Sequence, residues 1–138
     1  LALLQVPGTA VAAARTMAGR RVADSGWVAT ADGAPRDPWR GQAGSDPGYL
    51  NLDLAPAARL LPPENGWVAW REDLVEAWDA APEVPEPWRL AVGLHRTDRV
   101  AVVTPTVAHG ERPSPPPRTP APAELPRLRL DWRDRLRL

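Results

Sequence analysis

The order of hydrophobic and polar residues along the chain predicts two helices and several short strands. An alanine-rich run after Thr9 favours a helix over residues 9–24, because alanine has the highest helix propensity and Thr9 can cap the first turn. Alternation of apolar and polar positions is typical of half-buried strands. It predicts strands at 27–30 and 49–54 and a β-hairpin made of 88–95 and 99–104.

Large apolar residues mark the second helix. A stripe with spacings of three, four and four residues follows an Asn-Gly turn and contains Trp67, Trp70, Leu74 and Trp78. The stripe predicts a helix over 71–80 and leaves 67–70 open between helix and strand. One helical turn is expected at 55–61, ended by two prolines.

Proline divides the chain. Residues 111–126 contain seven prolines, which excludes a helix or a central strand and predicts an extended spacer. We therefore expect a small domain at 1–108, a proline-rich linker at 109–126 and an interaction arm at 127–138. The predicted fold is α+β: two helices on a small, mostly antiparallel sheet, and a proline-rich linker that leads to a C-terminal strand-like arm.

The arm at 127–138 has two different faces if it is a strand. Leucine or tryptophan fills the even positions except Asp134, and five arginines share the odd positions with Asp131. An isolated amphipathic strand satisfies neither its backbone groups nor its apolar face, so this arm is expected to pair with a partner. The predicted partner-binding residues are Leu128, Leu130, Trp132, Arg133 and Leu136, together with Trp39 from a glycine- and proline-rich loop.

The amino-acid composition excludes several classes of functional site. The chain has no cysteine, which removes disulfides, thiolate metal sites and cysteine nucleophiles. Its seventeen basic residues are all arginine and balance seventeen acidic ones, a composition typical of GC-rich bacterial genes and not of a dedicated nucleic-acid-binding protein. No apolar run reaches the ~20 residues of a membrane span. We expect no membrane partner and no cofactor.

Candidate catalytic and metal-binding residues are few. Ser25, Asp53 and His95 occur in the chain order of a hydrolase triad, but Ser25 lacks the Gly-x-Ser-x-Gly context. Two-ligand metal pairs are offered by His95 with Asp98 and by His109 with Glu111.

Two carboxylate clusters are weaker candidates still. An oxygen-rich loop contains Asp46, Asn51 and Asp53, whose spacing does not match an EF-hand. The acidic residues at 72–79 are expected to be the solvated face of a helix.

These patterns favour a non-enzymatic subunit or adaptor of a larger assembly that docks through its C-terminal arm, with a protein partner or a second copy of itself. Two alternatives stay open: a small hydrolase or metal-dependent enzyme using His95 or His109, and a nucleic-acid-associated protein using the arginine face of the arm. The expected compartment is the cytoplasm, with a virion or a secreted assembly as the alternative.

Overall fold

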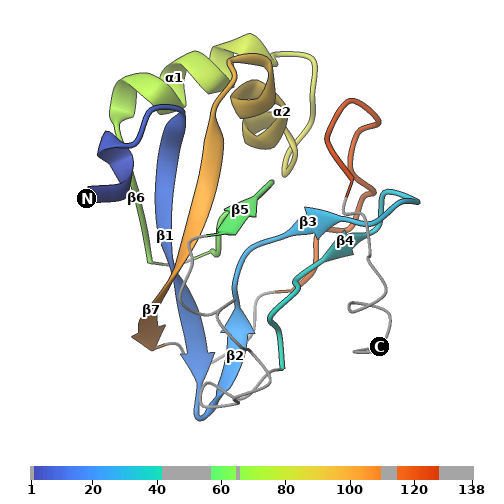
Figure 1. Ribbon diagram of the computed structural model, residues 1–138. Coiled ribbons are helices and arrows are strands. Elements are labelled where there is room, and N and C mark those ends of the chain that lie inside the picture. The colour runs from blue at the N-terminus through green and yellow to red at the C-terminus, as the bar shows by residue number, and fades with distance from the viewer. Residues whose placement is uncertain (1, 42–56, 65, 110–114, 128–138) are drawn as a thin grey trace.

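A computed structural model describes residues 2–41, 57–64, 66–109 and 115–127, which form a small α+β fold with two α-helices and a mostly antiparallel, curled sheet (Figure 1). The expected fold class is confirmed. In chain order the elements are η1 (Ala2–Gln5), β1 (Thr9–Ala18), β2 (Arg21–Asp24), β3 (Val28–Ala29), β4 (Pro35–Arg36), β5 (Ala57–Arg59), β6 (Trp67–Ala69), α1 (Arg71–Ala80), α2 (Arg89–Arg96) and β7 (Val100–His109).

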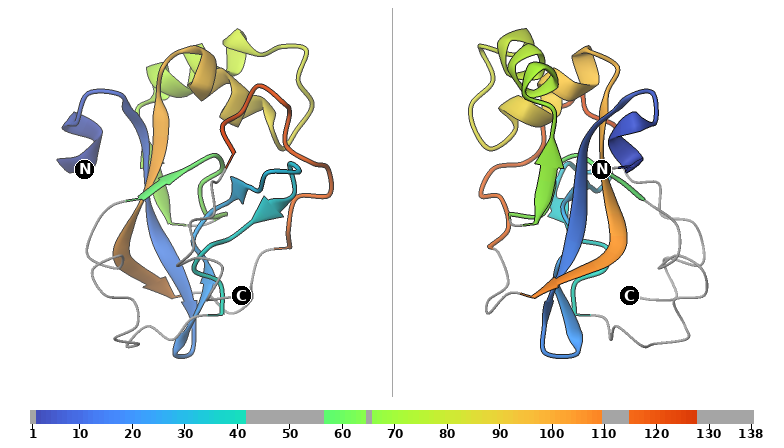
Figure 2. Two further views of the ribbon diagram at one scale, coloured as in Figure 1. Left: turned by 45° about the vertical axis from the view of Figure 1, so that its right-hand side comes forward. Right: turned by 90° about the vertical axis from the view of Figure 1, so that its left-hand side faces the viewer.

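The main sheet has five strands, and β1 is its centre. One side of β1 pairs in parallel with β7, which in turn pairs antiparallel with β5. The other side pairs antiparallel with β6 along residues 11–13 and with β2 along 16–18. Both helices lie at one end of this sheet and the β1–β2 turn lies at the other (Figures 1 and 2). Strands β5 and β6 are therefore on opposite edges of the sheet.

The predicted helix over 9–24 is wrong, because these residues form the β1–β2 hairpin, with Gly19 at a φ of +61° in the turn. Burial explains the difference. Strand β1 is covered on both faces, so it carries no period-two pattern. Its alanines let neighbouring strands and helices approach closely, and this tertiary packing outweighs their helix propensity.

The predicted hairpin is half wrong. Its first strand is instead helix α2, whose residues 91–94 are all buried. Its second strand is confirmed as β7, which continues through Pro105. The proline is tolerated because the β1–β7 register shifts between Ala14 and Arg15, and because β5 pairs with β7 only as far as Val103.

The remaining predictions have mixed outcomes. Helix 71–80 is confirmed as α1, and the strand at 27–30 is confirmed as β3, which pairs with β4. Residues 67–69, which the sequence left open, form β6. The helical turn expected at 55–61 is wrong, because 57–59 is strand β5. The strand expected at 49–54 lies outside the described residues.

The larger hydrophobic core gathers around Trp88, with Trp27, Leu61 and Leu125 among its buried members. The indole Nε1 of Trp88 donates a hydrogen bond to the carbonyl oxygen of Thr119 at 3.0 Å. The described part of the proline-rich segment, residues 115–126, has no helix or strand, as its composition predicts. It packs on the domain through Leu125 and Ala121.

Candidate docking surface

The largest exposed apolar side chains outside the N-terminal segment gather on β6 and the start of α1. Trp70 is 51% exposed, Val75 48%, Val68 46% and Trp67 39%. Leu74 and Trp78 of α1 are half-buried beside them. We call Trp67, Trp70, Leu74, Val75 and Trp78 the tryptophan face. Contiguous exposed apolar residues on one surface are typical of interaction sites, whereas single ones are ordinary.

Strand β6 is uncovered on both of its faces. Neighbouring residues of a strand point to opposite sides, and both Trp67 and Val68 are exposed. Within the described residues, β1 is the only sheet neighbour of β6. The outer edge of β6 therefore presents backbone groups that can pair with an added strand.

Helix α1 packs on α2 through its smallest side chains. Ala77 is fully buried, and a Cβ placed on Gly93 of α2 would lie only 1.7 Å from the Ala77 carbonyl oxygen. Because this contact fixes α1 by its alanine side, the large residues of the stripe are left half-buried or exposed. Of the four residues in the predicted stripe, Leu74 and Trp78 lie on α1, Trp70 is its N-cap residue and Trp67 lies on β6. Their side chains are half-buried or exposed.

Neither burial in the core nor helix capping accounts for a tryptophan at position 70. It is the N-cap residue of α1 and makes no side-chain capping hydrogen bond. Helices strongly prefer Ser, Thr, Asp or Asn at this position, because those side chains accept a hydrogen bond from a free backbone N–H group. An exposed tryptophan here therefore gives up local stability, which is typical of residues kept for binding.

A shallow groove of about 360 Å³ runs along the tryptophan face. Its walls are apolar apart from one carboxylate and are formed by Trp67, Leu74, Val75, Trp78, Asp79 and Leu90. The guanidinium of Arg89 stacks 4.0 Å from the centre of the Trp78 ring and holds that ring in place. Pro115 and Pro117 of the proline-rich segment border Trp67 on another side. The groove is thus preformed, and its apolar lining suits a side chain of a partner.

Acidic residues outnumber basic ones on α1, and one of them, Asp79, lines the groove of the tryptophan face. Helix α1 carries Glu72, Asp73, Glu76 and Asp79 against a single arginine, Arg71. Arg99 forms ion pairs with Asp73, at 3.3 Å, and with Glu76, and the hydrogen bond to Glu76 raises the pKa of Arg99. The surface of α1 thus keeps an excess of negative charge that favours a basic partner.

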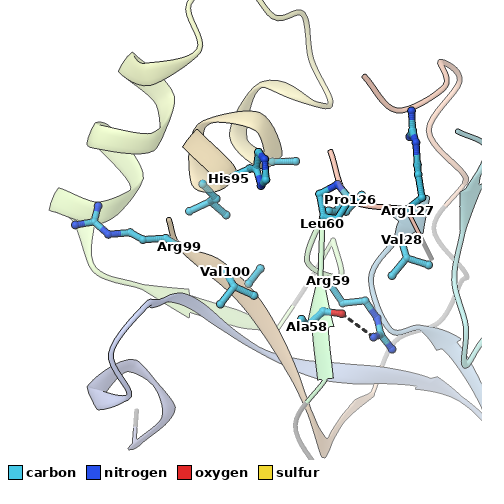
Figure 3. Close-up of a pocket in the computed structure, with 12 residues that line it drawn as sticks. Val28, Ala58, Arg59, Leu60, His95, Arg99, Val100, Pro126 and Arg127 are labelled. Carbon is cyan, nitrogen blue, oxygen red and sulfur yellow. Dashed lines mark hydrogen bonds between the residues drawn. The ribbon is translucent and has the colours of Figure 1, made fainter. Parts of the chain in front are cut away.

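A second hollow, of about 330 Å³, lies between β5, α2, β7 and Pro126–Arg127 (Figure 3). Arg59, Arg99 and Arg127 contribute side chains to its wall, but their guanidinium groups point away from one another (Figure 3). The Arg59 Nε and Nη1 atoms donate to the carbonyl oxygens of Ser25, at 2.8 Å, and Ala58, at 3.0 Å. Burial lowers the pKa of Arg59 to about 10. The cationic groups are therefore not gathered around one ligand.

The candidate hydrolase residues are not arranged for catalysis in the part of the chain that the structure describes. Ser25 is fully buried, and its hydroxyl group donates to Asp37, so no substrate can reach it. His95 is exposed on α2 and lines the second hollow. Asp53 lies outside the described residues.

The candidate metal pairs gain no third ligand within the described residues. Among residues 2–41, 57–64, 66–109 and 115–127, no three His, Asp or Glu side chains lie close enough together to hold a metal ion. Glu111, Asp46 and Asn51 lie outside those ranges. On α1, Glu72 and Glu76 are exposed, in agreement with a solvated helix face.

The predicted partner-binding residues fall in two groups. Trp39 is buried among Ala13, Met17, Val22 and Val103, and the Arg59 guanidinium lies 4.8 Å from the centre of its ring, so it leaves little surface for a partner. The arm residues Leu128, Leu130, Trp132, Arg133 and Leu136 lie outside the described residues.

Part of the tryptophan face repeats, in sequence, a segment of the hydrophobic core. The tetrapeptide Gly-Trp-Val-Ala occurs at 26–29 and again at 66–69. Trp27 is a buried core residue, whereas Trp67 is exposed. The two copies therefore differ in their surroundings and not in their local sequence.

Comparisons with protein families, curated proteins and solved structures find no match to this chain. Neither helix in the described ranges has the length and apolar character required to span a bilayer. The inference of function therefore rests on the surface geometry and on the sequence.

Proposed function

We propose that this protein is a non-enzymatic subunit or adaptor of a larger protein assembly, and that the tryptophan face is its principal docking surface. The observation that carries the proposal is the exposure of Trp70 at 51% and Val75 at 48%, beside a preformed apolar groove. A few residues seated in such pockets contribute most of the binding energy at protein interfaces, and tryptophan is enriched among them. The cytoplasm, expected from the sequence, remains the proposed compartment.

The C-terminal arm is the second docking element of this proposal. Its apolar positions can bury against a partner, and its arginines suit an acidic one. The segment that precedes the arm is anchored to the domain. Leu125 is buried in the core, and Arg127 Nη2 donates a hydrogen bond to the Ala121 carbonyl oxygen at 3.1 Å. The arm therefore begins at a fixed point on the domain.

The test compares partner capture by surface variants of the full chain. The variant Trp70→Ser with Val75→Ser removes the two most exposed side chains of the tryptophan face. Val6→Ser is the matched control, because Val6 is 50% exposed and is not part of that face. Tagged chains are expressed in the native host, cross-linked in the cell and purified, and each partner then recovered is bound quantitatively to the purified chains.

We expect the double variant to lose at least about tenfold in affinity for a direct partner, because interface tryptophans commonly contribute 2 kcal/mol or more. The Val6→Ser control should bind like the original chain. Equal binding by all three chains would overturn the tryptophan face as the docking surface. Loss of binding only when the arm residues Leu130 and Trp132 are changed would assign docking to the arm alone.

A further inference from the structure

The outer edge of β6 has two residues whose backbone groups point away from β1. The backbone N–H of Ala14 donates a hydrogen bond to the Gly66 carbonyl oxygen at 2.8 Å, so these residues form a hydrogen-bonded antiparallel pair. Such pairs alternate along an antiparallel ladder, and the next one on β6 is formed by Val68. The N–H and C=O groups of Trp67 and Ala69, which belong to the pairs between, are therefore directed outward.

This edge lacks the features by which proteins usually protect a free strand. Residues 66–70 contain no charged residue and no proline. Strand β1 is the only sheet neighbour of β6 within the described ranges. Side chains on both faces of the strand are exposed, Trp67 at 39% on one face and Val68 at 46% on the other. The edge is therefore suited to pairing with a further strand.

The edge of β6 is also complementary to itself. In an antiparallel pair of two β6 strands centred on Val68, Trp67 of each copy lies opposite Ala69 of the other. These are the residues with outward backbone groups, so the pair can form four hydrogen bonds between the copies. On one face, each tryptophan then lies beside a small alanine. On the other face, the two Val68 side chains meet at the two-fold axis, in the closely spaced type of pair that exchanges no hydrogen bonds.

Antiparallel pairing separates the helices of the two copies. Strand β6 leads into α1, and both helices lie at one end of the main sheet (Figure 1). A two-fold axis through β6 therefore places the helices of the second copy at the opposite end of the joined sheet. The two α1 helices consequently do not compete for one position.

From this geometry we infer that two copies of the chain pair through their β6 edges, in the register that places Val68 opposite Val68. The interface is isologous, since each copy offers the same strand to the other. The inference rests on the proposed function and deepens it, because it names a second copy of this chain as one partner at the exposed surface of β6.

A charge-exchange experiment on the full chain tests this register. Val68→Lys and Val68→Glu each place two like charges directly opposite each other at the two-fold axis. Val6→Lys is the control, because Val6 is similarly exposed, at 50%, and is not on β6. We expect the original chain and the control to dimerise at about 100 μM in sedimentation equilibrium, because small interfaces are weak. Each Val68 variant should raise the dimer dissociation constant at least about tenfold.

Mixing the Val68→Lys and Val68→Glu chains is the decisive step. Lysine of one copy then faces glutamate of the other, so we expect a heterodimer at least about fivefold tighter than the homodimer of either variant. Each chain carries a different fluorophore, so that the mixed species is identified directly. Such rescue requires an interface in which residue 68 faces its own counterpart.

Residue-resolved amide hydrogen exchange of the original chain gives an independent readout of the backbone pairing. The amides of Trp67 and Ala69 should exchange more slowly in the dimer than in the dilute monomer, because they donate to the second copy only there. The amide of Val68 faces β1 in both states and should change little.

Four results would overturn the self-pairing: a chain that is monomeric at about 100 μM, a dimer that Val68→Lys leaves unchanged, a mixture without rescue, or a dimer in which the amides of Trp67 and Ala69 gain no protection. The proposed function fails separately. If the chain is monomeric while Trp70→Ser with Val75→Ser loses another protein, only the self-pairing is wrong. If the charge pair restores a dimer while that variant keeps every other partner, the self-pairing stands and the tryptophan face is not the docking surface.

Discussion

Gly93→Ala tests the helix packing that leaves the tryptophan face exposed. In an exposed helix this change stabilises, because alanine exceeds glycine in helix propensity by about 1 kcal/mol. In α2, the new Cβ would lie 1.7 Å from the Ala77 carbonyl oxygen and 2.4 Å from its carbonyl carbon. The obstacle is backbone, so no side-chain rotation relieves it.

The size of the effect follows from the displacement required. An ordinary carbon–oxygen contact is about 3.3 Å, so α1 must move by roughly 1.6 Å relative to α2. Overpacking of this kind typically costs about 1–3 kcal/mol. The shift also opens the contacts of Ala77, which is fully buried. Because the obstacle is backbone, we take the upper end of that cost, about 3 kcal/mol, and subtract the gain in helix propensity of about 1 kcal/mol. We therefore expect Gly93→Ala to lower the free energy of unfolding by about 2 kcal/mol.

Urea unfolding followed by tryptophan fluorescence measures this change, and thermal unfolding should show a fall in Tm of about 8 °C. His95→Ala is the control within the same helix. His95 is exposed, so its replacement should change the free energy of unfolding by less than about 0.5 kcal/mol. If Gly93→Ala instead raises stability, α1 and α2 do not meet at Ala77, and the outward orientation of the stripe loses its explanation.

Other predictions follow from single contacts. Asp37→Ala should lower the free energy of unfolding by about 3 kcal/mol in urea, because the carboxylate accepts buried hydrogen bonds from the backbone N–H groups of Ser25 and Trp39; an unchanged midpoint would contradict this. Trp70→Ser should raise that free energy by roughly 0.5–1 kcal/mol, since serine caps helices well, and a large loss would show that Trp70 is structural. The hydrogen bond from Arg96 lowers the pKa of Glu83, so the folded state binds fewer protons than the unfolded chain, and this stabilisation is lost as the pH falls below about 4.5. Glu83→Gln should therefore flatten the pH dependence of the free energy of unfolding in that range. Parallel curves for the two chains would refute the pairing.

The elements that the sequence predicted correctly are those with local evidence. Helix α1 carries a stripe at helical spacing, and β7 shows alternation after a short polar turn. Proline content correctly excluded a helix or strand from the described residues 115–126. These properties depend on neighbouring residues, so one segment at a time is enough to infer them.

The wrong predictions concern segments whose state is set by distant partners. Strand β1 pairs in parallel with β7, whose residues lie about ninety positions later in the chain, and it is buried on both faces. In 88–95, alternate large residues also satisfy helical spacing, because Leu90 and Leu94 are four apart. As a helix, α2 packs closely on α1 where Gly93 meets Ala77. The local sequence pattern of 88–95 does not reveal this contact.

The candidate site was only partly accessible to sequence reasoning. The stripe of Trp67, Trp70, Leu74 and Trp78 was visible, but a stripe of this kind normally faces a core. Its exposure depends on which side of α1 meets α2, and the smallest side chain, Ala77, decides that. Trp39 shows the reverse case: it stands in a glycine- and proline-rich loop and is nevertheless buried.

Hydroxyl-radical footprinting with residue-resolved mass spectrometry tests the central claim most directly. Oxidation of Trp67 and Trp70 is compared between the dilute free chain and the chain in its assembly, with the buried Trp88 as the internal reference. The tryptophan face predicts that both residues react readily in the free chain and are protected in the assembly, while Trp88 stays unreactive throughout. Equal oxidation of Trp67 and Trp70 in the free and assembled states would contradict it.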